Sequence, residues 1–352
     1  MNTEKKWGSK IILSAVILLC CIGGLTAFVD PYFHYHAPLS FLEYPLNNQR
    51  YQNDGIVRNF DYDAIITGTS MTENFKTTEF DNLFNVNSIK VPFSGATYKE
   101  ITQNLWRGLS ENPETKIVIR SLDFYCLISD KDAMGYNSYP TYLTDDNLFN
   151  DVKYLLNKEI LFDSTLDVLQ YTINGGKSTS FDEYSSWGSY FTYGKDEVLK
   201  RYTRPEKNTE IYSLSVAERD LIAGNIAHNI VELAEAYPDT KFYCYFPPYS
   251  IFFWDSLKQT GSFTKYIEAF TLATELMLQQ ENIYVFSFFD AYDVVTNLEN
   301  YKDTEHHTAE INTQILHWMK NDEHKLTSDN FRVHWNDVKS YYDNYDYSKL
   351  FN

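Results

Sequence analysis

Three polar side chains have types and spacings that suit acyl transfer through a serine. Ser70 ends a Gly-Thr-Ser run after a short apolar stretch, and Asp303 and His306 are three residues apart before a predicted helix. A serine hydroxyl becomes a nucleophile when a neighbouring histidine takes its proton. An aspartate on the other ring nitrogen holds the imidazole in the required tautomer. We therefore predict Ser70 as the nucleophile, His306 as the base and Asp303 as the residue that orients the base.

Backbone N–H groups could supply the oxyanion hole for this chemistry. Gly95 lies in a turn over residues 93–96, directly after the next predicted strand. Glycine lets the backbone approach a ligand closely. N–H groups aimed at the carbonyl oxygen stabilise the charge that develops there. We predict that Ser70 and Gly95 provide these two donors.

The same residues also fit plainer roles. Ser70 has Glu73 three positions on, which is the spacing of a helix capping box, and Asp303 could cap the helix that follows it. Asp303, His306 and His307 could together bind a metal, although the sequence offers neither a fourth ligand nor a HExxH motif. We favour acyl transfer because Ser70, Gly95 and the Asp303 segment all follow predicted strands. We expect no metal and no cofactor.

Short apolar segments alternate with amphipathic helices over most of the chain. Strands are predicted over residues 64–67, 86–92, 116–122, 241–246 and 283–288, and helices over residues 98–110, 215–237 and 263–280. Strands separated by helices predict an α/β fold, a three-layer α/β/α sandwich around a mainly parallel, five-stranded sheet. Ligands of such sheets bind beyond the carboxyl ends of the strands, where the candidate residues are expected.

The N-terminus contains one segment of membrane-spanning length. Residues 11–29 carry no charge and would measure about 28 Å as a helix, close to the thickness of a bilayer core. Lysines precede the segment and Asp30 follows it, which favours a cytoplasmic N-terminus. A cleaved signal peptide is the alternative, but the apolar run is long and a good cleavage site is missing. We expect a single-pass anchor in the cell membrane with the rest of the chain outside.

We expect the chain to consist of five consecutive parts. The predicted parts are a cytoplasmic tail over 1–10, the anchor, a juxtamembrane segment over 30–59, an α/β domain over 60–325 with an insertion over 137–204, and a C-terminal extension over 326–352. The insertion is rich in tyrosine, and tyrosine rings can stack on sugars. We predict that the insertion holds a glycan.

The net charge argues against one class of partner, and the remaining cysteines and histidines each allow two interpretations. A net charge of −18 argues against nucleic acid as a partner, because phosphates require a basic surface. Cys126 and Cys244 could form a disulfide, although two free thiols are favoured. His34 and His36 could bind a metal, but they have no third ligand nearby, and a place at the bilayer interface is favoured.

Gly68-Thr69-Ser70, Gly95 and Asp303-x-x-His306 occur in an order that resembles the SGNH hydrolase superfamily, also called GDSL-like. The resemblance covers about residues 61–321. With its N-terminal anchor, the chain is similar to a bacterial surface branch. That branch includes the D-alanyl transfer protein of lipoteichoic acid and the alginate-type O-acetyltransferases, which work beside a membrane-bound O-acyltransferase.

This resemblance implies an SGNH/flavodoxin-like sandwich and a serine-dependent esterase or O-acyltransferase. The implied substrate is an acylated cell-surface glycopolymer or lipid-linked glycan, such as a polysaccharide or a teichoic-acid-like polymer. A membrane-bound O-acyltransferase is the implied partner.

One position departs from the family pattern. The family places an asparagine after the third strand to complete the oxyanion hole, whereas this chain has Asp123 there. Asp123 could donate only if it were protonated, which needs a strongly raised pKa, so a structural role is favoured. This departure keeps a second hypothesis open, a non-catalytic, membrane-anchored binding or assembly partner that retains the fold.

Overall fold

The computed structural model describes residues 2–136, 139–145 and 147–351. The chain divides into two units, each with its own contacts. The first comprises Met1–Asp61 and Ser138–Ser180, and the second comprises Tyr62–Asn137 and Phe181–Asn352. Residues 138–180 of the predicted insertion therefore belong with the N-terminal segment, and residues 181–204 belong with the α/β part.

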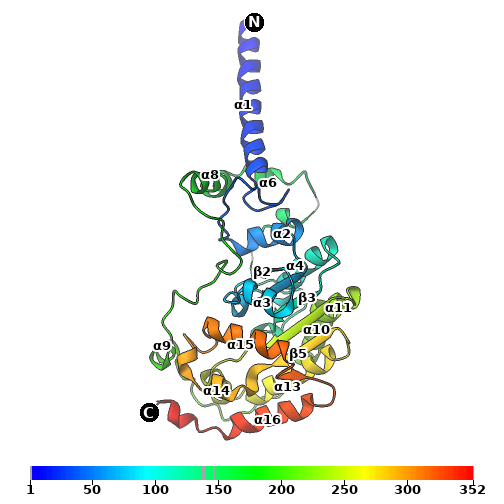
Figure 1. Cartoon of the computed structure of the whole chain (residues 1–352), viewed down its shortest axis with the longest axis vertical. Coiled ribbons are helices and arrows are strands. Elements are labelled where there is room, and N and C mark those ends of the chain that lie inside the picture. The colour runs from blue at the N-terminus through cyan, green and yellow to red at the C-terminus, as the bar shows by residue number, and fades with distance from the viewer. Residues whose placement is uncertain (1, 137–138, 146, 352) are drawn as a thin grey trace. The chain divides into compact units, whose positions relative to one another are not determined.

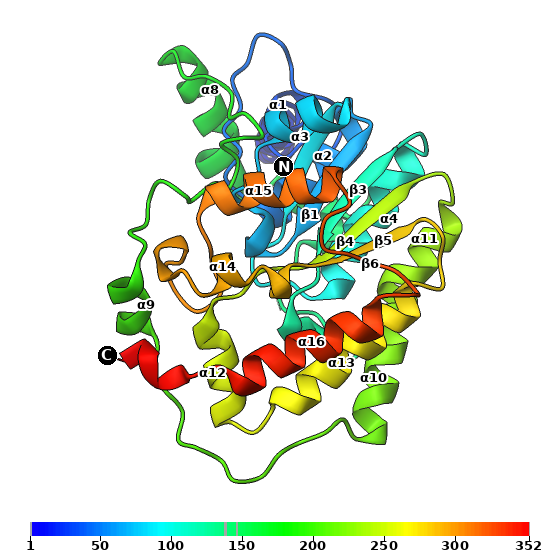
Figure 2. The same cartoon turned by 60° about the horizontal axis from the view of Figure 1, so that its bottom comes forward.

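The second unit is built on one six-stranded sheet (Figure 2). Its strands are β1 (Ala64–Gly68), β2 (Ser88–Pro92), β3 (Ile117–Ser121), β4 (Lys241–Phe246), β5 (Ile283–Ser287) and β6 (Lys325–Leu326), in the order β2-β1-β3-β4-β5-β6. The first five are parallel and β6 is antiparallel. The predicted α/β fold with a mainly parallel sheet is confirmed. The short strand β6 was not predicted, because a strand of two residues is too short to show a recognisable pattern of apolar side chains.

Helices cover both faces of this sheet, which explains why its strands are continuous apolar runs in the sequence. One face carries α3 (Thr77–Phe84) and α15 (Ala309–Lys320), whose side chains pack with Ile66, Ile119 and Phe286. The opposite face carries α4 (Tyr98–Glu111), α10 (Val216–Ile226), a π-helical turn (Ala227–Val231), α11 (Glu232–Ala236), α13 (Phe263–Met277) and α16 (Phe331–Asn344) (Figure 2). The three predicted helices are therefore found.

The other helical segments of this unit are short. They are η1 (Ser70–Thr72), α5 (Phe124–Leu127), α9 (Lys195–Arg201), α12 (Ile251–Gln259), η5 (Phe288–Asp290), α14 (Tyr292–Val295), η6 (Leu298–Asn300) and η7 (Tyr347–Phe351). Cys126 and Cys244 are both buried in this unit as free thiols. The favoured interpretation of these two residues is confirmed.

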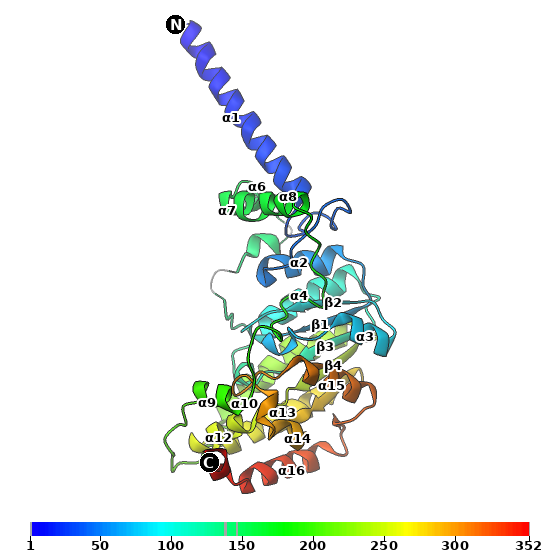
Figure 3. The ribbon, with the colours of Figure 1, turned by 60° about the vertical axis from the view of Figure 1, so that its left-hand side comes forward.

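The first unit is helical and begins with α1 (Asn2–Val29) (Figure 1). Within the described chain, Lys6–Val29 is the one stretch of helix long and apolar enough to cross a membrane. The unit also contains α2 (Gln49–Asn59), η2 (Thr141–Leu143), α6 (Val152–Leu155), α7 (Lys158–Ile160), a π-helical segment (Leu161–Thr165) and α8 (Leu166–Ile173). Helices α6, α7 and α8 lie beside the C-terminal end of α1 (Figure 3).

The two histidines that follow α1 have separate partners in this unit. His34 Nε2 lies 3.4 Å from Asp151 Oδ1. His36 contacts the carbonyl oxygens of Ala37 and Ala27 through its two ring nitrogens. Both rings therefore take part in local packing around the end of α1.

Candidate active site

The turn that carries the predicted nucleophile Ser70, here called the nucleophile turn, begins where β1 ends. Gly68 has φ +146°, and a β-carbon there would collide with Ser121 Oγ and lie 2.8 Å from Thr72 Cγ2. Only glycine lets the chain turn sharply at this point. The following turn η1 is capped by Thr69, whose hydroxyl accepts the N–H of Met71. Ser70 is therefore the first residue of the turn and not its cap.

The structure brings Ser70, His306 and Asp303 together. Ser70 Oγ lies 2.8 Å from His306 Nε2, and His306 Nδ1 lies 2.9 Å from Asp303 Oδ2 and 3.0 Å from Asp303 Oδ1. About a quarter of the His306 side chain is exposed, so a substrate can reach it. These distances are those that a serine–histidine–aspartate proton relay needs.

The His306 ring and two backbone N–H groups together hold Asp303 in its charged form. Its Oδ1 accepts the N–H groups of Glu305 and His306 at 2.9 Å and 2.8 Å. Burial alone would raise the pKa of Asp303, but these hydrogen bonds and that of the His306 ring outweigh it and lower the pKa to about 2. The next helix, α15, is preceded by Thr308 as its N-cap residue, so Asp303 does not cap it.

The segment after β4 fixes the loop that carries Asp303 and His306. Tyr301 donates its hydroxyl to the carbonyl of Pro248 at 2.6 Å. Ser250 donates both its N–H and its hydroxyl to the carbonyl of Thr304, at 3.0 Å and 2.8 Å. Asp303 and His306 are therefore positioned by the segment that follows the carboxyl end of β4, at the sheet edge where the fold class places ligands.

Gly95 lies in the turn that follows β2. The N–H of Phe93 donates to the carbonyl of Gly68 at 2.8 Å, which holds the start of this turn against the end of β1. Gly95 has φ +64°, and a β-carbon on it would point into open space. Within the residues that the structure describes, the N–H groups of Ser70 and Gly95 donate to no protein acceptor. Both remain available to a substrate.

Asp123 is buried at the end of β3 and accepts three hydroxyl groups. Its carboxylate takes hydrogen bonds from Thr69 Oγ1 at 2.6 Å, Ser121 Oγ at 2.9 Å and Tyr249 OH at 2.8 Å. Burial raises the pKa of this carboxyl group, and the three hydrogen bonds oppose that rise. The carboxylate thus ties the nucleophile turn to β3 and to the loop after β4.

Each of the three hydroxyl groups that donate to Asp123 also accepts one backbone N–H group. The donors are Thr69 to Ser121 at 3.2 Å, Met71 to Thr69 at 3.4 Å, and Phe124 to Tyr249 at 3.4 Å. A hydroxyl has one proton and two acceptor positions, so each of these groups can accept its N–H group and donate its proton to the Asp123 carboxylate. The carboxylate is therefore an acceptor and does not take the place of an amide donor in the oxyanion hole.

Two neighbours of His306 differ in their surroundings. His307 is buried, and its Nδ1 lies 3.1 Å from the carbonyl of Thr308, so its ring turns into the protein. Burial lowers the pKa of His307 to about 4. Burial also raises the pKa of Glu305 to about 7, a rise to which the charges of Asp123 and Asp303 add. Among the described residues, no group of three or more His, Cys, Asp or Glu side chains is arranged to hold a metal ion.

Trp187 was not predicted as a site residue, yet its ring contacts that of His306. Its ring lies edge-on to His306 with centroids 5.6 Å apart. Its Nε1 donates to Glu73 Oε2 at 2.7 Å, and its backbone N–H donates to Asn74 Oδ1 at 3.0 Å. Glu73 and Asn74 follow the nucleophile turn directly. The turn that carries Ser70 therefore also holds the tryptophan.

Lys302 lies against the same aromatic group. Its Nζ is 3.6 Å from the ring centroid of Trp187 and 3.9 Å from that of Phe191. Burial lowers the pKa of this lysine. The two rings and the lysine stem form an apolar wall with one cationic group beside the Ser70–His306 pair.

A buried lysine on β2 binds the two segments that support this apolar wall. Lys90 Nζ donates to the carbonyls of Glu73 at 2.6 Å, Phe75 at 2.8 Å and Asp182 at 3.4 Å. Burial lowers its pKa to about 7. The lysine joins the segment after Ser70 to the segment before Trp187, so both are held to the edge of the sheet.

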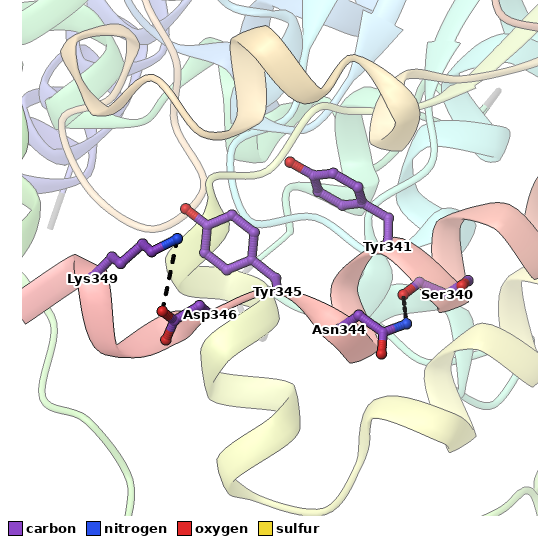
Figure 4. Close-up of a pocket in the computed structure, with 6 residues that line it drawn as sticks. All are labelled: Ser340, Tyr341, Asn344, Tyr345, Asp346 and Lys349. Carbon is purple, nitrogen blue, oxygen red and sulfur yellow. Dashed lines mark hydrogen bonds and ion pairs between the residues drawn. The ribbon is translucent and has the colours of Figure 1, made fainter.

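A separate surface pocket of about 520 Å³ lies along the C-terminal end of α16 (Figure 4). Its lining residues are Ser340, Tyr341, Asn344, Tyr345, Asp346 and Lys349. Tyr341 stacks on Tyr292 with ring centroids 3.6 Å apart. None of the lining residues belongs to the site around Ser70.

No family model and no curated protein sequence matches this chain. Among solved structures, one from Streptococcus pneumoniae, described as a candidate platelet activating factor, superposes with a TM-score of 0.40 and 10% sequence identity. The superposition covers 78% of this chain and 90% of that chain. Neither value assigns the present chain to a family.

Proposed function

We propose that this protein is a serine-dependent esterase or O-acyltransferase of the SGNH type. One observation carries the proposal, namely the continuous contact from Ser70 Oγ through the His306 ring to the Asp303 carboxylate. It lies at the carboxyl ends of parallel strands, where ligands of such sheets bind. The serine, glycine and Asp-x-x-His blocks of the sequence support the SGNH assignment.

The first half of the reaction transfers an acyl group to Ser70. Ser70 Oγ attacks the ester carbonyl carbon while its proton passes to His306 Nε2. The N–H groups of Ser70 and Gly95 donate to the oxyanion, and Asp303 stays charged and stabilises the imidazolium. The bond to the alcohol oxygen then breaks, and His306 returns the proton to that oxygen. Ser70 is left as an ester.

The second half removes the acyl group. A water molecule or a sugar hydroxyl gives its proton to His306 and attacks the ester on Ser70. Release of Ser70 Oγ, which takes the proton back, completes the cycle. Water as acceptor makes the protein an esterase, and a sugar hydroxyl makes it an O-acyltransferase.

The proposed substrate is an acylated cell-surface glycopolymer or lipid-linked glycan outside the membrane. Two observations support this class. Helix α1 has the length and composition of a membrane anchor, and lysines at its start favour a cytoplasmic N-terminus. Trp187, whose ring contacts His306, and Phe191, whose ring contacts Trp187, offer aromatic surface on which a sugar ring could stack. A membrane-bound O-acyltransferase would supply or receive the acyl group.

A second candidate function rests on Asp123. Because its carboxylate only accepts hydrogen bonds, the oxyanion hole lacks the side-chain amide donor of the SGNH family. A non-catalytic, membrane-anchored assembly partner would tolerate this loss. The two candidates differ in whether Ser70 reacts.

Labelling with a fluorophosphonate probe separates the two functions. The wild-type chain should be labelled, and Ser70→Ala should abolish labelling. Ser110→Ala removes an exposed serine on α4 and should leave labelling unchanged. Absence of labelling in the wild-type chain, or equal labelling of wild type and Ser70→Ala, would favour the assembly partner.

A further inference from the structure

The helical segment beside the end of α1 exposes an apolar stripe. On the continuous helical stretch from α7 to α8, Phe162, Leu166 and Ile173 are 62%, 36% and 83% exposed. Their spacings of four and seven residues place them on one face of the helix. On the opposite side, Ile160 and Val168 are buried in the unit. The segment therefore has two apolar faces, whereas a helix on the surface of a soluble domain usually has one.

A third face of the same segment is polar. Glu159, Asp163, Asp167 and Gln170 are exposed and recur at spacings of four and three residues. The exposed apolar stripe is thus bounded by acidic side chains. Upstream of it, α6 and the residues on either side of it expose four more apolar side chains: Leu148, Phe149, Val152 and Leu156.

Packing against α1 sets the position of this segment along the length of that helix. Helix α1 contacts α6 and the π-helical segment within the first unit. A β-carbon at Gly23 would lie 3.5 Å from Leu156 Cδ2 and 3.6 Å from Leu155 Cβ. Gly23 precedes Val29, the end of the apolar run, by six residues, or about 9 Å of helix. These leucines therefore lie beside the apolar part of α1 and not beyond it.

Hydrogen bonds to Asp30 stabilise the packing of α6 against the end of α1. Its carboxylate accepts the hydroxyl of Tyr154 at 2.7 Å and the N–H groups of His34 and Tyr35 at 3.0 Å and 2.7 Å. Asp30 and Tyr154 are both buried. Tyr154 is in α6, so one buried carboxylate fixes the end of α1, the chain that follows it and α6 to one another.

We propose that residues 148–173 lie in the outer leaflet of the bilayer as an amphipathic ledge, with the exposed apolar stripe against lipid acyl chains. The inference rests on the proposal that α1 spans the membrane. Lipid is the occupant because the ledge packs on α1 at a depth where α1 is itself surrounded by acyl chains. The acidic face then points toward the headgroups and water.

Spin labels on single cysteines of the full chain in phosphatidylcholine liposomes test this placement. The background carries Cys20→Ser and Cys21→Ser, which remove the two exposed thiols of α1. Labels replace Phe162 and Ile173 on the apolar stripe, and Asp163 and Asp167 serve as matched controls on the polar face of the same segment. A label at Leu18, which is exposed on α1, reports whether the anchor spans.

Labels at Phe162 and Ile173 should collide severalfold more often with oxygen than with a water-soluble nickel chelate, as at Leu18, and both aspartate positions should show the reverse. Lipid-like collisions at Leu18 with water-like collisions at Phe162 and Ile173 would overturn the ledge alone. Water-like collisions at Leu18 as well would overturn the anchor. Shielding of Phe162 and Ile173 from both reagents would show a protein cover and would also overturn the proposal. Fluorophosphonate labelling of the same variants reports separately on the Ser70 site.

Discussion

Single hydrogen bonds set the chemistry of the candidate site. Asp303 accepts two backbone N–H groups in addition to the His306 ring, so its charge does not depend on the histidine alone. Asp123 accepts hydrogen bonds from three hydroxyl groups. The two aspartates have different roles, since one faces the base and the other supports the nucleophile turn.

Asp123→Asn introduces the residue type of the SGNH pattern, yet we expect it to harm this protein. An amide NH₂ in place of one carboxylate oxygen would face a hydroxyl that already donates, so at least one buried hydrogen bond is lost. The free energy of unfolding should fall by about 1–3 kcal/mol in denaturant titrations. Asp132→Asn, at an exposed carboxylate, is the matched control. A rise in the rate of fluorophosphonate labelling for Asp123→Asn would contradict the acceptor role.

The lowered pKa of Asp303 predicts a pH-dependent stability. In the folded chain this pKa is about 2, and in an unfolded chain an aspartate titrates near ~3.9. Asp303 therefore contributes stability above about pH 4, and that contribution is lost as the pH falls through about 2. Asp303→Asn should lower the unfolding free energy at pH 7 by roughly 2 kcal/mol. The difference between variant and wild type should shrink as the pH falls toward 2, and a difference that is constant with pH would contradict the assignment.

At the scale of elements, the carboxyl ends of the strands explain why distant residues meet. Ser70 follows β1, Gly95 follows β2, Asp123 follows β3, and the loop after β4 holds Asp303 and His306 in place. The glycines at the end of β1 and after the end of β2 both have positive φ, but their surroundings differ. Gly68 is closely surrounded, whereas Gly95 faces open space.

The two glycines should respond differently to alanine. Gly68→Ala forces a β-carbon onto Ser121 and Thr72, so it should cost about 3 kcal/mol or more and abolish fluorophosphonate labelling. Gly95→Ala meets no neighbour and should cost only the backbone strain, about 1–2 kcal/mol. Unfolding titrations of both variants measure the difference. Equal losses would show that close packing at Gly68 is not the cause.

Much of this arrangement could be predicted from the sequence because it depends on local patterns. Apolar runs such as residues 117–119 indicate buried parallel strands, and the three-residue spacing of Asp303 and His306 is local as well. Trp187 could not be predicted, because its position depends on Glu73 and Asn74, more than a hundred residues away. The hydrogen bond between Asp30 and Tyr154 is equally distant in sequence and joins residues 138–180 to the N-terminal segment.

At the scale of the whole molecule, α1 is the element from which the location of the protein can be predicted. Its apolar length and the lysines before it predict a cytoplasmic N-terminus and an external α/β unit. In intact cells that produce the full chain, a protease added outside should remove a C-terminal epitope and leave an N-terminal epitope intact. Permeabilised cells, in which both epitopes should be digested, are the control. An N-terminal epitope missing from the mature chain would show instead that the segment is a cleaved signal peptide.

The central claim is that Ser70 carries the acyl group during turnover. Incubation of the full chain with an activated acetate ester, followed by acid quenching and mass spectrometry of its peptides, tests it most directly. Wild type should show one acetyl group on the peptide that contains Ser70, and His306→Ala should slow its formation by about 10³-fold or more. Acetylation at any other residue with Ser70 unmodified, or equal rates in wild type and His306→Ala, would contradict the claim.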